Sequence, residues 1–164
     1  MKSYILLDLN GTVGTDLPDL LEKLENPDNF VWVEKVQAHI KLSTLKRLKE
    51  ISEKYDTTVL WASLRGKDAI CLNSLIDVNW GWIDINDTIN RYNAWSKTAP
   101  ITKFAKKHDD SLIIFCDDML INNNAYSEIK SEAPNIKLII PSTTIGLTDK
   151  QLDEIEDILK TSIS

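Results

Sequence analysis

The stretch YILLDLNGTVG, residues 4–14, joins a short apolar run to a polar turn. Residues 4–7 have the length and composition of a buried strand. The dipeptide Asn10-Gly11 on its own is a strong signal for a tight β-hairpin turn. Asp8, directly after the apolar run, instead suggests the mouth of an active site, with Asn10 standing where an acid would be expected. The rest of the sequence decides between these two interpretations.

Four further apolar runs of strand length follow the first, at residues 58–61, 80–85, 112–116 and 136–140. Each run is short and nearly continuous, as expected for strands that are covered on both faces in a parallel sheet. The segments between them carry helical periodicity, with an expected N-cap at Ser43, a helix that stops at Pro134, and a capping box of Thr148 and Gln151 before a last amphipathic helix. This alternation predicts an α/β fold, a three-layer, doubly wound, Rossmann-like parallel sheet of about five strands.

The chain of 164 residues is long enough for one domain with a real core and too short for two ordinary ones, so we expect a single domain, 1–164. Residues 14–41 are less regular than the rest. Within them, apolar residues from Val36 to Leu42 alternate with polar ones as in a half-exposed strand, and residues 30–33 are the expected hairpin partner. We therefore predict that residues 14–41 form a flap or minimal lid.

Composition and charge limit the classes of function. Hydrophobic residues make up 43% of the chain and charged residues 27%, which is usual for a globular protein. The formal net charge of -6 disfavours binding to polyanions such as DNA, RNA and acidic membranes, so a phosphate ligand would need a bound cation. The sequence shows no signal-peptide core and no membrane-length apolar segment, and we expect a cytoplasmic protein.

Polar residues follow the ends of three predicted strands: Asp8 and Asn10 the first, Ser63 the second, and Asp117 with Asp118 the fourth. The carboxyl ends of parallel strands meet at one edge of a sheet, where ligands bind in this fold class. Two aspartates at the end of a buried strand are costly unless a cation or hydrogen-bond donors offset their charge. Together with Asp8 they supply the oxygen ligands that Mg²⁺ prefers. The alternative is that Asp117 and Asp118 cap the helix that follows.

Four short motifs occur in a fixed order: DLNGTV after the first strand, VLWAS ending at Ser63, SKTAP containing Lys97 before a helix, and IIFCDD ending at Asp118. Over residues 4–118 this order resembles the four motifs of the haloacid dehalogenase (HAD) superfamily. The wider pattern is similar to small, capless (C0-type) HAD-like proteins, including some phage proteins and HAD domains associated with RNA repair. The resemblance implies a HAD-like fold in which a short flap stands in place of a cap domain.

The resemblance also implies chemical roles. Asp8 would attack phosphorus and form an aspartyl-phosphate. Ser63 and Lys97 would bind the transferring phosphoryl group by hydrogen bonding and charge. Mg²⁺ would be held by the side chains of Asp8, Asp117 and Asp118 and by the backbone carbonyl of Asn10.

Supporting roles and rivals complete the predicted site. Gly11 would permit the sharp turn after Asn10, and Thr12 would orient the loop. Arg65 would contact substrate from the loop after Ser63, although a surface arginine is the simpler interpretation. Lys103 is the rival of Lys97, but helical periodicity places it beside the core-facing Phe104 and away from the strand ends. Trp32, on the predicted flap, is a candidate to stack on a substrate base.

Asn10 departs from the pattern of HAD phosphatases, which place a second aspartate two residues after the nucleophile. That aspartate protonates the leaving oxygen and later activates water, a contribution commonly worth about 10²- to 10⁴-fold in rate. An amide transfers no proton, so three explanations compete. The substrate has a good leaving group, or the site binds a phosphorylated ligand without turnover, or the asparagine is an engineered substitution that traps substrate.

The sequence thus predicts a Mg²⁺-dependent HAD-type phosphatase or phosphotransferase that acts on a small phosphorylated metabolite or nucleotide, with turnover impaired by Asn10. One alternative is a noncatalytic phosphate-ligand or nucleotide-binding protein on the same fold. A narrower alternative is a polynucleotide 3'-phosphatase. The acidic balance of the chain restricts a nucleic-acid partner to a phosphorylated end and argues against a membrane partner.

Overall fold

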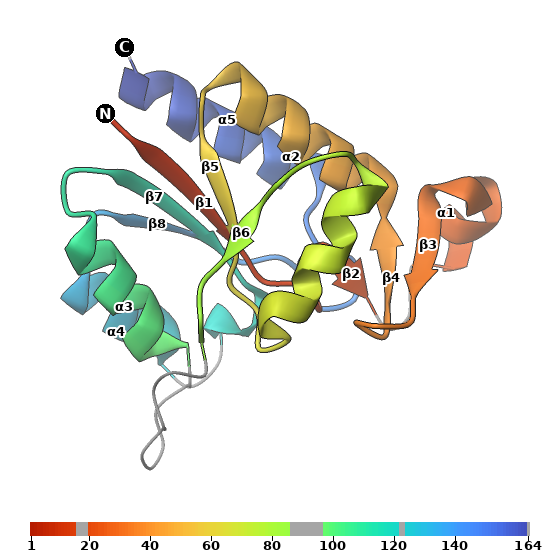
Figure 1. Cartoon of the computed structure of the whole chain (residues 1–164), viewed down its shortest axis with the longest axis horizontal. Coiled ribbons are helices and arrows are strands. Elements are labelled where there is room, and N and C mark those ends of the chain that lie inside the picture. Colours follow the sequence, from red (N-terminus) through yellow and green to blue (C-terminus); the bar gives the residue numbers. More distant parts are fainter. Residues whose placement is uncertain (16–19, 86–96, 122–123, 164) are drawn as a thin grey trace.

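A sheet of five parallel strands forms the centre of the computed structural model, which describes residues 1–15, 20–85, 97–121 and 124–163. The strands lie in the order β6-β5-β1-β7-β8 and comprise β1 (Ser3–Leu7), β5 (Thr58–Trp61), β6 (Gly81–Trp82), β7 (Leu112–Cys116) and β8 (Ile136–Ile139). From β1 the chain builds outward on one side to β6 and then on the other side to β8 (Figure 1). The strand order therefore reverses between β1 and β7, which is where open α/β sheets bind their ligands.

Helices cover both faces of this sheet. Figure 1 shows α2 (Leu42–Lys54) and α5 (Asp149–Ile163) on one face, with α3 (Thr98–Lys107) and α4 (Ala125–Glu132) on the other. Successive side chains of β1 point to opposite faces, so Ile5 and Leu7 pack in the core under α2 and α5 while Leu6 packs under α3 and α4. The predicted doubly wound α/β class, with about five parallel strands, is confirmed.

The predicted helix starts meet different outcomes. The capping box at α5 is confirmed, because the Thr148 N–H donates to Gln151 Oε1 at 3.1 Å and the Gln151 N–H donates to Thr148 Oγ1 at 3.3 Å. The N-cap at Ser43 is wrong, since α2 already begins at Leu42. Asn29 supplies the missing partner from a distant segment: its Oδ1 accepts from the Ser43 N–H at 2.8 Å.

The strand predicted at 80–85 is much shorter in the structure, where β6 covers only Gly81–Trp82. Its apolar content serves packing, because the Trp80 ring lies 5.6 Å from the Trp61 ring within the core. Asn73, in the 3-10 helix η2 (Gly66–Leu75), ties the two tryptophans together. Its Nδ2 donates to the Trp80 carbonyl at 2.8 Å and its Oδ1 accepts from Trp61 Nε1 at 3.1 Å.

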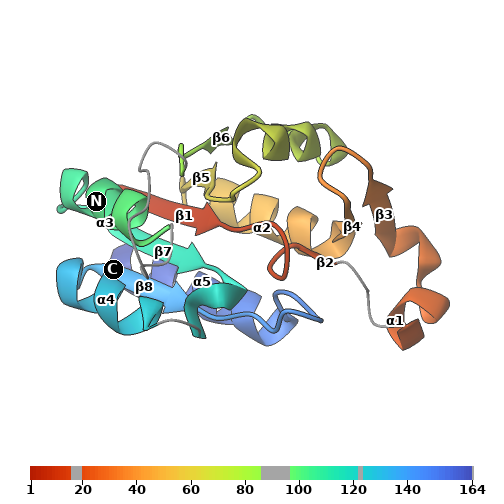
Figure 2. The ribbon, with the colours of Figure 1, turned by 90° about the horizontal axis from the view of Figure 1, so that it is seen from below.

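The predicted 14–41 insert contains a second, antiparallel sheet in the order β2-β4-β3, made of β2 (Gly14–Thr15), β3 (Phe30–Val33) and β4 (Ala38–Lys41). The predicted hairpin of β3 with the following strand is confirmed, although β4 begins at Ala38 rather than Val36. The helix α1 (Leu20–Glu25) and the 3-10 turn η1 (Pro27–Asn29) complete it, and residues 16–19 lie outside the described part. Figure 2 shows β3 and α1 at one end of the molecule.

The insert is anchored to the domain through its last strand. Val36, Ala38 and Ile40 are fully buried and belong to the same core cluster as β1 and α2. Within the described residues, no helix combines the length and apolar character that a membrane span requires.

Candidate functional site

Three buried carboxylates meet where β1 and β7 end. Leu7 and Cys116 are register partners in these neighbouring strands, and the Asp8 N–H donates to the Cys116 carbonyl at 3.0 Å. One carboxylate oxygen from each of Asp8, Asp117 and Asp118 lies within 4.8 Å of the others. The three residues are 6%, 0% and 4% exposed. This spacing and this burial suit a shared cation.

Lys97 places its ammonium between two of these carboxylates. Its Nζ lies 2.5 Å from Asp8 Oδ1 and 2.5 Å from Asp117 Oδ2, and the residue is buried. Lys97 stands immediately before α3, so the start of that helix positions it. The rival Lys103 is exposed on α3. The structure therefore brings Lys97 to the carboxylates and leaves Lys103 at the surface.

Asp117 uses both of its carboxylate oxygens. Oδ2 contacts Lys97, while Oδ1 accepts from the Met119 N–H at 2.9 Å and caps the 3-10 turn η3 (Asp118–Ile121). One oxygen of Asp117 therefore caps the turn, as the capping interpretation predicts, and the other forms an ion pair with Lys97.

Burial dominates the electrostatics of the site. It raises the pKa of the Asp117 carboxyl to about 7, with the charge of Asp8 adding to the rise and Lys97 opposing it. Burial also raises the pKa of Asp8 against the pull of Lys97. Burial would lower the pKa of Lys97, but the two carboxylates outweigh it and the pKa is raised. When all three carboxylates are ionised, one ammonium does not balance them, and a further cation would.

The loop at residues 9–14 is not a simple hairpin turn. The Leu9 carbonyl accepts hydrogen bonds from three successive N–H groups, those of Thr12, Val13 and Gly14. Gly11 has φ +79°, and a Cβ placed on it would lie 2.4 Å from both Cγ and Oδ2 of Asp118. Glycine is therefore needed here twice, for the left-handed backbone and for the close approach of the Asp118 carboxylate.

Two residues of this loop, Asn10 and Thr12, carry buried polar atoms without a hydrogen-bond partner, and so does Asp118, which lies against Gly11. Among the described residues, the buried side-chain atoms without a hydrogen-bond partner are Asn10 Oδ1, Thr12 Oγ1, His39 Nδ1, Thr98 Oγ1 and Asp118 Oδ1. All except the His39 atom belong to the predicted motifs. Each such atom costs about 1–3 kcal/mol if it stays unsatisfied, so these atoms are available to a ligand, an ion or water. Carboxylate, amide and hydroxyl oxygens fit a hard cation with its water shell.

Thr98 was not among the residues predicted from the sequence, and its buried Oγ1 has no hydrogen-bond partner. It follows Lys97 directly, at the first position of α3, and it is buried. The available signal was a hydroxyl residue next to the motif lysine at a helix start, where a side chain can reach an anion near the helix N-terminus.

Ser63 lies at the same edge, on the other side of β1. The Ala62 N–H donates to the Leu7 carbonyl at 2.7 Å, so β5 runs alongside β1 up to this point. Ser63 is buried, and its Oγ accepts from the Arg65 N–H at 3.2 Å. The side chain of Arg65 is exposed at the start of η2.

Trp32 is not brought to the site. It lies on β3, the outer strand of the small sheet, whereas the loop that carries Asp8 leads into β2 on the other side of β4. Its Nε1 donates to Glu34 Oε2 at 2.8 Å and its ring centroid lies 4.9 Å from that of His39. Trp32 is therefore part of the surface of the insert.

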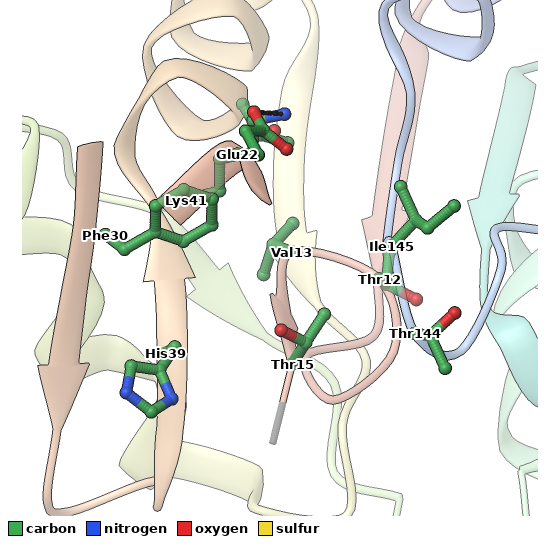
Figure 3. Close-up of a pocket in the computed structure, with 10 residues that line it drawn as sticks. Thr12, Val13, Thr15, Glu22, Phe30, His39, Lys41, Thr144 and Ile145 are labelled. Carbon is green, nitrogen blue, oxygen red and sulfur yellow. Dashed lines mark ion pairs between the residues drawn. The ribbon is translucent and has the colours of Figure 1, made fainter. Parts of the chain in front are cut away.

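A small cavity lies behind Thr12, between the Asp8 loop, β4 and residues 144 and 145 (Figure 3). Its volume is about 10 Å³, which is room for about one water molecule and too small for a substrate. Figure 3 shows Thr12 and Thr144 on one side of it and His39 on the other. The Leu147 N–H donates to the Thr12 carbonyl at 2.8 Å, so the loop after β8 holds this part of the Asp8 loop in place.

The described structure thus gathers Asp8, Lys97, Asp117 and Asp118 at one edge of the sheet. Asn10 lies in the loop that follows Asp8, and Ser63 follows β5, the strand next to β1. Comparison with known proteins adds no relative, because no family model, no curated protein and no solved structure matches the chain. The case for a function therefore rests on the residues of this site and their geometry.

Proposed function

We propose that the chain is a Mg²⁺-dependent phosphatase or phosphotransferase that acts on a small phosphorylated metabolite or nucleotide through an aspartyl-phosphate on Asp8. One observation carries the proposal: three buried carboxylates, with one oxygen from each within 4.8 Å of the others, lie at the carboxyl edge of a parallel sheet, and a buried lysine ammonium bridges only two of them, Asp8 and Asp117. A purely structural ion pair needs no third buried carboxylate, whose desolvation is costly. We further propose a HAD-type fold in which the 14–41 insert stands in place of a cap domain.

The residues at this edge fit Mg²⁺. Asp8, Asp117 and Asp118 would hold the ion, together with the backbone carbonyl of Asn10. The donor cluster contains oxygen atoms only, with no histidine or cysteine, which favours a hard cation over zinc or copper. Asp118 Oδ1, buried and without a hydrogen-bond partner, is the atom most in need of such a ligand. Mg²⁺ bound there would offset the negative charge of the phosphoryl oxygens.

Asp8 would supply the nucleophile. One of its carboxylate oxygens forms a bond to phosphorus as the bond from phosphorus to the leaving oxygen breaks, and the product is an acyl phosphate. Water, or an acceptor hydroxyl in a transferase, then takes the phosphoryl group and restores the carboxylate. Lys97 would stabilise the charge on the phosphoryl oxygens, since its ammonium already lies 2.5 Å from Asp8 Oδ1.

Ser63 and Arg65 would bind the phosphate end and the outer part of the substrate. The Ser63 Oγ accepts from the Arg65 N–H, which leaves its own hydroxyl proton to donate to a phosphoryl oxygen. Both residues act by position and charge, and neither exchanges a proton in the reaction.

Asn10 sets the rate. Its amide can hydrogen-bond to a leaving oxygen but gives it no proton, so substrates with a good leaving group, such as acyl phosphates, should react faster than ordinary monoesters. The same amide favours a second candidate function, the binding of a phosphorylated ligand without turnover. In that case Mg²⁺ and Lys97 would hold the phosphate in a site that cannot complete the reaction.

Hydrolysis assays on the present chain and on Asn10→Asp test the proposal. The panel contains acetyl phosphate, an aryl phosphate and nucleoside monophosphates, each with and without Mg²⁺. We expect Mg²⁺-dependent hydrolysis of acetyl phosphate by both proteins. On ordinary monoesters, Asn10→Asp should gain about 10²- to 10⁴-fold in kcat. Asp8→Asn should abolish turnover. Lys97→Met should also lose activity, whereas its matched control Lys103→Met should keep it.

Two controls sharpen this experiment. Asn-Gly sequences can deamidate, which would turn Asn10 into an aspartate. Exchange of the amide for an acid group adds roughly 1 Da, so intact-mass measurement must show that the present chain carries no such heavier fraction. Calorimetry with nucleotides identifies the second candidate. Absence of Mg²⁺-dependent hydrolysis in both proteins would refute the enzyme, and tight nucleotide binding in the same samples would establish the binder.

A further inference from the structure

Large apolar side chains are exposed directly beside the residues of the proposed phosphate site. Leu64 follows Ser63 and is 54% exposed, while Met119 and Ile121 follow Asp118 and are 39% and 75% exposed. Single exposed apolar residues are ordinary on protein surfaces. These three are unusual in their placement, because each stands one to three residues after a member of the site.

The three residues lie on opposite sides of Asp8. Leu64 comes after β5 and the other two come after β7, and these strands flank β1 in the sheet. Neighbouring strands lie about 4.8 Å apart, so the two sides are separated by about 10 Å at the sheet. A phosphate held at Asp8 would send its organic group outward between them. We refer to Leu64, Met119 and Ile121 as the apolar rim.

We propose that the apolar rim binds the organic group of the substrate, so that the site takes soluble phosphate esters or acyl phosphates of a short alkyl or aryl group in preference to sugar phosphates. This inference rests on the proposed function, which supplies the phosphate end. Burial of apolar surface against the rim favours an apolar group. A sugar placed there would lose hydration of its hydroxyls without replacement.

The net charge of the chain indicates which class of phosphorylated molecule could bring an apolar group to the rim. The net charge of -6 opposes approach to an anionic lipid surface or to a nucleic acid. A small soluble ester carries only the charge of its phosphate, which the cation and Lys97 would offset. The rim therefore fits a small molecule better than a phosphate embedded in a membrane.

Calorimetry with phosphonates, which are not hydrolysed, tests the inference on the full chain with Mg²⁺. The probes are inorganic phosphate, methylphosphonate, butylphosphonate, phenylphosphonate and 3-hydroxypropylphosphonate. A fully buried methylene is worth about fourfold in affinity, so butylphosphonate should bind at least about tenfold more tightly than methylphosphonate. The hydroxypropyl compound has the length of the butyl one with a terminal hydroxyl, and it should bind more weakly than butylphosphonate.

Matched variants assign the effect to the rim. Leu64→Ser and Ile121→Ser should flatten the dependence on chain length and leave the binding of inorganic phosphate unchanged. Leu24→Ser is the control, because Leu24 is 70% exposed on α1, which Figures 1 and 2 both place at the far end of the insert. It should leave the whole series unchanged.

The outcomes separate this inference from the proposed function. Mg²⁺-dependent binding of phosphate with equal affinity for the methyl and butyl compounds would overturn the inference and leave the function standing. No binding of any probe would overturn both. Sedimentation with phosphatidic acid vesicles, or self-association that Ile121→Ser abolishes, would overturn the choice of a small soluble ester, because the rim would then serve a membrane or a second copy of the chain.

Discussion

Replacement of Gly11 by alanine tests the geometry of the carboxylate cluster directly. A Cβ at this position would lie 2.4 Å from Asp118 Cγ and Oδ2 and 2.7 Å from Oδ1, whereas ordinary contacts begin near 3.4 Å. The carboxylate of Asp118 must therefore retreat by about 1 Å, or the loop must move away from it. Ligand distances in metal sites stay within about 0.2 Å of their usual values, so a shift of this size disrupts a site. The first movement takes Asp118 out of position as a ligand, and the second moves the loop that carries the Asn10 carbonyl away from the proposed metal position.

Two separate losses follow from this change. The left-handed backbone at φ +79° costs about 1–2 kcal/mol for a residue with a Cβ, which lowers the free energy of unfolding of Gly11→Ala even without metal. The displaced carboxylate weakens Mg²⁺ binding further. Loss of an outer partner of a metal ligand typically costs about 10- to 100-fold in affinity, and loss of a direct ligand should cost at least as much.

Calorimetric titration with Mg²⁺ and denaturant unfolding with EDTA measure the two losses independently. Gly66→Ala is the matched control, because Gly66 also has a left-handed backbone, at φ +54°, but stands at the start of η2. It should lose comparable stability and keep its Mg²⁺ affinity. If Gly11→Ala bound Mg²⁺ as tightly as the unmodified chain, Asp118 would not be a ligand and the proposed cluster would be wrong.

Three further predictions use other contacts of the structure. Without metal, Asp117 has a pKa of about 7 in the native state against about 3.9 in the unfolded state, so between these values the native state binds one more proton than the unfolded state. The free energy of unfolding should therefore fall by up to about 4 kcal/mol as the pH rises through that window. Equal stability at pH 5 and pH 8 in EDTA would contradict this. Mg²⁺ needs the ionised carboxylate, so its affinity should decrease as the pH falls below 7, by up to about tenfold per pH unit in a calorimetric titration. Asn73→Ala should lower the free energy of unfolding by about 2–4 kcal/mol, because it leaves Trp61 Nε1 and the Trp80 carbonyl without their buried partner, and an unchanged denaturation midpoint would show that water replaces both bonds.

The parts of the fold that the sequence predicts well are those that local pattern encodes. The two inner strands β1 and β7 appear as continuous apolar runs because both faces are covered: four of the five residues of β1 and all five of β7 are buried. Because the carboxyl ends of parallel strands meet at one edge of the sheet, the residues that follow these runs can be placed together without a structure. The capping box of Thr148 and Gln151 lies within one helical turn, so its spacing alone predicts it.

The features that the sequence does not predict depend on contacts between distant segments. The partner of Ser43 is Asn29, which a hairpin brings back to the start of α2. The carbonyl of Trp80 is taken by the side chain of Asn73 rather than by a long strand. The tight fit of Gly11 against Asp118 joins residues more than a hundred positions apart. None of these contacts leaves a periodic signal in the chain.

The hydrogen bonds that fix the Asp8 loop do not use the side-chain oxygen of Asn10. The turn is fixed by backbone bonds to the Leu9 carbonyl and by Gly11, while Asn10 Oδ1 has no hydrogen-bond partner. A carboxyl of the same shape would add a further negative charge to a loop that lies against the Asp118 carboxylate. Like charges favour the protonated form of such a carboxyl, which can act as a general acid. Asparagine removes that proton and that repulsion together. The present chain should thus bind an anionic phosphate ligand at least as tightly as the Asn10→Asp variant but turn substrate over more slowly. Measurement of Kd and kcat on this pair of proteins decides whether binding or turnover is the function of this site.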